Sequence, residues 1–151
     1  MKKVECIHET LKHIRKVGTL MVQIINRAFE RALVHDDSKL REPELTLFNR
    51  YTPKLKLTDY GSEEYYDILK KMAPALKYHY TSNSHHPEHY EKGIKDMNLV
   101  DILEMLCDWM ASSERHDTGD IYKSLEHNQT RFGYSDDVKA ILWNTIKYMG
   151  W

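Results

Sequence analysis

The sequence predicts an all-α protein, and three observations support this. Apolar residues recur at helical spacing through most of the chain. Capping residues followed by acids precede several of these stretches, as at the start of helices. No stretch of any length alternates apolar and polar residues as a half-buried strand does. We expect a single helical domain over residues 1–151, with about six or seven helices.

Residues 3 to about 30 are expected to form one or two amphipathic helices. Their apolar arc runs from Val4 round to Leu20 and includes His13, which is either a core histidine or a ligand. A metal shared by His13 and His35 requires the chain to reverse between them, because 22 residues of straight helix span roughly 33 Å. Gly18 is the strongest helix breaker in that interval.

The remaining elements follow from turn and capping residues. Residues 52–61 are expected to be a loop, because they include Pro53 and Gly61. Asn98 is expected to cap a helix, and Ser62 another. The helices are expected at about 43–51, 62–80, 98–110, 117–130 and 136–149.

Composition excludes several classes of protein. With 22 basic and 23 acidic residues the net charge is −1, so we expect no binding to duplex nucleic acid. Cys6 and Cys107 lie far apart and form neither zinc-finger spacing nor a disulfide framework, which fits a reducing cytoplasm. We expect no signal peptide and no membrane partner, because the first residues mix charges and no apolar run is long enough to span a bilayer.

The pair His35-Asp36 is the first candidate metal-binding motif. A neutral imidazole nitrogen and a hard carboxylate oxygen make a compact pair of ligands. Lys39 follows within one helical turn, and its ammonium can hold negative oxygens of a substrate without binding the metal.

A second candidate motif is a cluster of four histidines in residues 79–89. His79 is expected to end a helix, with His85 and His86 in a turn beside it, so several ring nitrogens can converge. His86 precedes a proline and should be extended, and His89 is expected to be exposed. The alternative is a polar loop that binds no metal.

Asp108 is the third candidate. It shares one side of its helix with Glu104 and Arg115, which is either a solvated face or the polar wall of a site. Glu104 lies one turn before Asp108, so both carboxylates can reach one pocket.

The order of these motifs on a helical chain resembles the HD superfamily of metal-dependent phosphohydrolases. It is most similar to a small uncharacterised bacterial and phage family with three motifs: His-Asp-x-Ser-Lys, Asn-x-His-His-Pro-Glu and Glu-Met-x-x-Asp-Trp. Here these are residues 35–39, 83–88 and 104–109. The resemblance covers residues 13 to about 115.

The resemblance implies an HD-like domain that binds one or two divalent ions, with Mn, Fe, Co, Ni and Zn as candidates. It implies hydrolysis of a small phosphate ester such as a nucleotide. Lys39 and Arg115 would neutralise phosphate charge, and Glu104 is a further candidate catalytic residue. The implied ligands are His13, His35, Asp36 and Asp108, with His79, His85 and His86 completing a second metal or holding the nucleophile. Two alternatives stay open: a di-iron oxygenase with the same ligands, and a non-enzymatic interaction protein with structural histidines.

Overall fold

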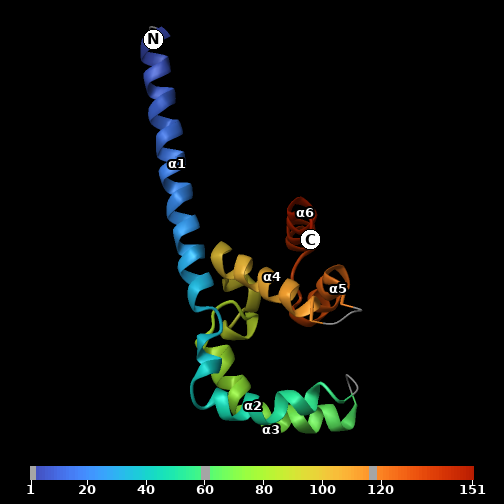
Figure 1. Cartoon of the computed structure of the whole chain (residues 1–151). Helices are drawn as coiled ribbons and strands as arrows, with labels where there is room; N and C mark the ends of the chain where they lie inside the picture. Colours follow the sequence, from blue (N-terminus) through green and yellow to red (C-terminus); the bar gives the residue numbers. More distant parts are fainter. Residues whose placement is uncertain (1–2, 59–61, 116–118) are drawn as a thin grey trace. The chain divides into compact units, whose positions relative to one another are not determined.

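A computed structural model describes residues 3–58, 62–115 and 119–151, and within these ranges the regular elements are all helices (Figure 1). The all-α prediction is therefore confirmed. The chain divides into two compact units, Met1–His35 and Asp36–Trp151. Six α-helices are described, and three short 3-10 helices, η1 (Asp37–Leu40), η2 (Pro87–His89) and η3 (Gly93–Asp96), lie between them.

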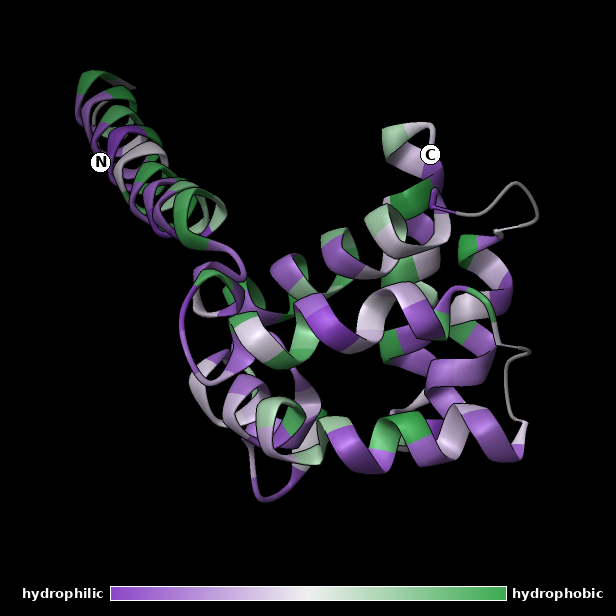
Figure 2. Ribbon diagram, turned by 60° about the horizontal axis from the view of Figure 1, so that its bottom comes forward, coloured by the Kyte–Doolittle hydropathy of each residue, from purple (hydrophilic) through white to green (hydrophobic). Residues whose placement is uncertain are grey.

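The first unit consists of α1 (Lys3–Val34), one unbroken helix of 32 residues. Gly18 does not interrupt it, because a glycine inside a helix costs about 1 kcal/mol relative to alanine but removes no hydrogen bond. The reversal that a shared ligand role for His13 and His35 requires is therefore absent. Apolar and polar residues are interspersed along α1 (Figure 2).

The second unit begins with two helices that pack side by side, α2 (Glu44–Leu55) and α3 (Glu63–Ser82). The hydroxyl of Ser62 caps α3 as expected, by accepting a hydrogen bond from the backbone N–H of Tyr65 at 3.1 Å. The expected loop over 52–61 begins later than predicted, because α2 continues through Pro53 to Leu55. A proline in the last turn removes only one helical hydrogen bond, and Leu55 is half-buried. Residues 59–61 lie outside the described part.

The remaining helices of the second unit are α4 (Leu99–Ser113), α5 (Ile121–Phe132) and α6 (Asp136–Met149). Asn98 caps α4 in a capping box with Asp101, and α6 has the predicted bounds. Asp120 caps α5, while residues 117 and 118 of the expected helix start lie outside the described part. These helices share one buried apolar core, made of Ile94, Met97, Met105, Leu106, Ile121, Leu125, Tyr134, Leu142 and Ile146.

Leu125 is the residue with which we test this core. It is 0% exposed, so Leu125→Ala leaves a cavity and should lower the free energy of unfolding by about 2–5 kcal/mol. Leu57 is 89% exposed, so Leu57→Ala should change it by less than about 0.5 kcal/mol. Urea denaturation of both variants measures the difference, and equal losses would contradict the described core.

Candidate metal centre

Asp36 stands at the start of the second unit in an unusual backbone conformation. Its φ of 57° and ψ of 16° are left-handed, a region that aspartate tolerates better than most residues. η1 follows directly, and its residue Lys39 pairs with Oδ2 of Asp36 at 2.5 Å. The other oxygen, Oδ1, faces the histidines.

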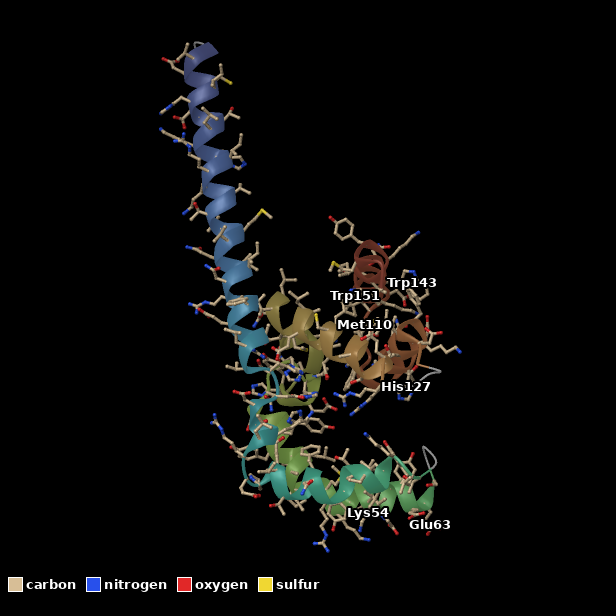
Figure 3. All side chains as sticks on the ribbon, in the orientation of Figure 1. Lys54, Glu63, Met110, His127, Trp143 and Trp151 are labelled. Atoms are coloured by element: carbon tan, nitrogen blue, oxygen red, sulfur yellow. The ribbon has the colours of Figure 1, made fainter. Side chains whose placement is uncertain are left out.

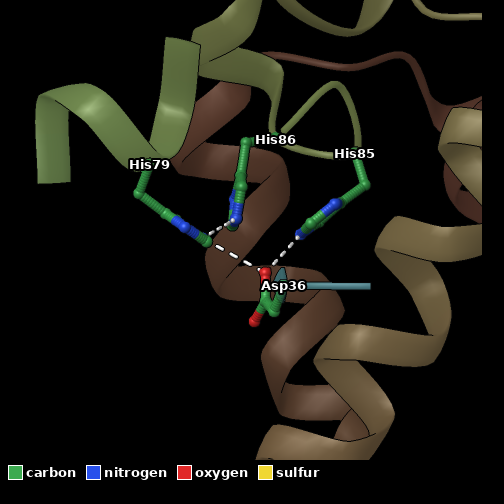
Figure 4. A group of neighbouring side chains, drawn as sticks. All are labelled: Asp36, His79, His85 and His86. Atoms are coloured by element: carbon green, nitrogen blue, oxygen red, sulfur yellow. Dashed lines mark hydrogen bonds and ion pairs between the residues drawn. The ribbon is translucent and has the colours of Figure 1, made fainter. Parts of the chain in front are cut away.

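Three imidazoles converge on Asp36 (Figure 4). His79 comes from the last turn of α3, while His85 and His86 come from the loop between α3 and η2. Oδ1 of Asp36 lies 3.4 Å from Nε2 of His79 and 3.5 Å from Nε2 of His85. Nε2 of His86 lies 2.7 Å from Nε2 of His79. His79 and His85 are buried, and His86 is half-buried with the extended backbone expected before a proline.

The spacing of these four donors fits a single metal ion. Nitrogen and oxygen donors at about 2.0–2.2 Å from one ion lie about 2.8–3.6 Å from each other. The separations of 2.7, 3.4 and 3.5 Å are close to this range. Three imidazole nitrogens with one carboxylate oxygen suit Zn, Fe, Mn, Co or Ni. The prediction that histidines and acids gather into a cluster that could hold a metal is confirmed.

Two further carboxylates orient the rings. Glu44, the first residue of α2, is 0% exposed, and its Oε2 lies 2.9 Å from Nδ1 of His79. Oε1 of Glu104 lies 2.9 Å from Nδ1 of His85. A carboxylate at Nδ1 holds the proton on that nitrogen, so the lone pair on Nε2 faces the centre. Metal-binding histidines in proteins are commonly held in this way.

The environment favours the neutral form of His79 and His86, which is the form that binds metals. Burial lowers the pKa of His79, and the Lys39 ammonium lowers it further against the opposing carboxylates of Asp36 and Glu44. Burial, together with neighbouring His85 and His79, lowers the pKa of His86 to about 3.

A buried aspartate fixes the loop that carries two of the histidines. Asp101 of α4 is 1% exposed and accepts hydrogen bonds from the hydroxyls of Ser84 and Tyr90, both at 2.7 Å. Its Oδ2 also accepts from the backbone N–H of Asn98 at 3.2 Å. The capping group of α4 therefore also holds the segment on either side of His85 and His86.

Hydrogen bonds of Asn83 also connect η1 to the end of α3. The side-chain amide of Asn83 donates to the hydroxyl of Ser38 at 2.8 Å and to the carbonyl of His79 at 2.8 Å. Ser38 and Asn83 belong to the motifs at residues 35–39 and 83–88, so these motif positions connect the segments that carry Asp36 and His79.

Of the other predicted residues of the second unit, Asp108 and Lys39 lie close to Asp36, whereas Arg115 and His89 are exposed. A carboxylate oxygen of Asp108 lies within 4.8 Å of one of Asp36, which brings together two predicted ligands of the second unit. Lys39 contacts Asp36 and lies over the ring of Phe48, 5.5 Å from its centroid. Arg115 is exposed beyond the end of α4, and His89 is exposed as expected.

His13 and His35 both belong to the first unit. His13 is exposed on α1, so the expectation of a core histidine is wrong for this helix. Because α1 is unbroken, the 22 residues between His13 and His35 span roughly 33 Å, and one ion cannot bind both in the same chain. His35 immediately precedes Asp36, and its role as a ligand stays a prediction.

A cavity of about 660 Å³ lies beside the cluster in the second unit, and His86 and Asp108 both line it. Its other walls are aromatic side chains of α3 and α4 and a polar face of α5. Lys123, His127 and Arg131 lie four residues apart on that face, so they share one side of the helix. Figure 3 labels His127 on α5. Arg131 pairs with Glu88 of η2 at 2.5 Å.

Sequence reasoning missed Glu44, Asp101 and the polar face of α5. Glu44 and Asp101 resemble ordinary acids in the first turn of a helix, so nothing marks them as buried. The spacing of Lys123, His127 and Arg131 was visible, but spacing alone does not distinguish a cavity wall from a solvated face.

Comparison with known proteins gives a family but no activity. A family model described as "Family of unknown function (DUF5662)" matches residues 2–148. Neither the curated proteins nor the solved structures include a match. In the part of the chain that the structure describes, no helix combines the length and apolar character needed to cross a membrane.

Glu44 provides a test of the metal centre. Glu44→Gln removes the charge that fixes the ring of His79, so affinity for Zn²⁺ or Mn²⁺ should fall by about 10- to 100-fold. Glu63→Gln, an exposed acid in the first turn of α3, should leave affinity unchanged. Calorimetric titration of chelator-treated protein measures both, and an unchanged affinity in Glu44→Gln would refute the orienting role.

Proposed function

The chain belongs to the family of unknown function DUF5662, and from its site we propose a metal-dependent phosphohydrolase that acts on a small phosphate ester, with nucleotides as the first class to test. The observation that carries this proposal is the convergence of His79, His85, His86 and Asp36 beside a cavity large enough for a small molecule.

In such a reaction, different residues of the site would have different roles. His79, His85, His86 and Asp36 would hold the ion, and Asp108 lies close enough to join them or to accept a proton from an attacking water. When bound, a divalent ion polarises phosphoryl oxygens and lowers the pKa of water. His35 and Glu104 remain candidates, the first as a ligand and the second through its contact with His85.

Cations near the centre would neutralise a substrate phosphate. Lys39 contacts Asp36 and is about one-third exposed, so its ammonium can also reach a ligand. Lys123 and Arg131 of α5 line the cavity beside His86, while Tyr80 and Trp109 offer an aromatic surface on which a flat group can pack. A nucleotide carries both an anionic phosphate and a flat aromatic base, so it matches the cations and the aromatic surface of this cavity.

A redox reaction is the second candidate, because a set of histidines and carboxylates also binds Fe²⁺. Di-iron oxygenase chemistry would use the same donors. The two reactions differ in what they consume, so one set of assays can separate them.

The test is a screen of nucleotides and generic phosphoesters with Mn²⁺, Fe²⁺, Co²⁺, Ni²⁺ and Zn²⁺. We expect phosphate release that requires a metal and is lost, together with bound metal, in Asp36→Ala. Lys39→Ala should keep its metal and lose about 10²-fold in turnover, because it removes a charge partner of the phosphate. Lys70→Ala, an exposed lysine of α3, should match the wild type.

Other outcomes would change the proposal. Oxygen consumption by the iron-loaded protein without hydrolysis would replace the hydrolase with the oxygenase. Purified protein that binds none of these metals and is inactive in both assays would refute both, and leave the histidines with a structural role.

A further inference from the structure

The helix α1 exposes an unusual amount of apolar surface. Thirteen of its large apolar side chains are between 40% and 77% exposed. Isolated helices of this kind gain little stability in water, because helices in proteins are stabilised mainly by packing of an apolar face. Contiguous apolar surface of this extent marks an interaction site.

The apolar positions of α1 follow a heptad repeat. Spacings alternate between three and four residues, as in helices that pack along a seam with another helix. The seam positions in chain order are Val4, Ile7, Leu11, Ile14, Gly18, Met21, Ile25, Ala28 and Ala32. Apolar residues also flank the seam, at Val17, Val22, Ile24 and Phe29. The partner that fits this face is therefore a helix with a matching repeat.

We propose that α1 pairs with α1 of a second copy of this chain, in antiparallel orientation. Large side chains fill the first four seam positions, while the small residues Gly18, Ala28 and Ala32 occupy three of the remaining five. Antiparallel pairing therefore places each small residue opposite a large one. The core layers are Ile7 with the partner's Ala32, Leu11 with the partner's Ala28, Ile14 with the partner's Ile25, and Gly18 with the partner's Met21.

Parallel pairing fits this seam poorly. It would place Gly18 against the partner's Gly18, Ala28 against the partner's Ala28 and Ala32 against the partner's Ala32. Those layers would leave voids, and each void costs stability because protein interiors are close-packed. In the single chain nothing lies within 4 Å of a Cβ built at Gly18, so the helix has room for the partner's Met21 at that position.

The length of α1 is sufficient for a stable pair. Its 32 residues extend about 48 Å, which is more than four heptads, and the antiparallel register overlaps nearly the whole helix. Pairing would bury seam positions on both copies at once, since a two-fold contact uses the same surface twice.

The first experiment measures the mass of the full-length protein by analytical ultracentrifugation. We expect a dimer of two 18.0 kDa chains for the wild type. Ile14→Asp places a charge in the seam and should weaken the dimer at least about 10-fold, whereas Gln23→Asp on the opposite side of α1 should not. A monomeric wild type, or equal effects of both substitutions, would overturn the proposal.

The second experiment leaves α1 unaltered except for a spin label on its native Cys6, so it does not depend on a substitution in the seam. Cys6 and Cys107 are both exposed, so Cys107→Ser leaves one labelling site. In the antiparallel pair Cys6 lies opposite residue 33 of the partner, and the two labels should be about 40 Å apart. A separation under about 20 Å would show parallel pairing, and no distance between chains would show a monomer. Either result refutes the antiparallel dimer.

Discussion

The candidate metal centre depends on the burial of a carboxylate beside each of two imidazoles. Glu44 is fully buried against Nδ1 of His79, and Glu104 is nearly buried against Nδ1 of His85. Burying a charged carboxylate is costly unless it is paired, so these contacts favour the arrangement in which both Nε2 atoms point inward. A metal ion at the centre would add positive charge to this group of carboxylates and imidazoles.

The backbone that carries these groups is fixed by ordinary capping. Asn98 and Asp101 begin α4 as a capping box, and the same Asp101 carboxylate accepts from Ser84 and Tyr90 on the loop that holds His85 and His86. The buried Asp101 carboxylate therefore has two roles. It accepts a hydrogen bond from a backbone N–H at the start of α4, and it holds the loop in place through Ser84 and Tyr90. Asn83 likewise connects two segments, because its side-chain amide donates to Ser38 of η1 and to the carbonyl of His79 near the end of α3.

How far the sequence predicts this structure depends on the range of the interactions involved. Helix starts at Ser62, Asn98 and Asp136 were predictable because caps and periodicity are local. The residue types suggested that Asp36 and the histidines lie together. The sequence did not predict the burial of Glu44, because its partner His79 lies 35 residues away. His13 was misplaced because its position on an apolar arc indicates a covered face, whereas α1 exposes that face in the single chain.

The order of the donors along the chain also bears on how the protein folds. His79, His85 and His86 lie within eight residues of one another, while Asp36 is more than forty residues upstream. A disordered chain therefore already contains a short segment with three imidazoles that could hold an ion before α2 and α3 pair. Ions bound by unfolded chains stabilise those chains too, so part of the affinity does not contribute to the free energy of unfolding. During folding, the metal would therefore order residues 79–86 first, and Asp36 would bind to it afterwards.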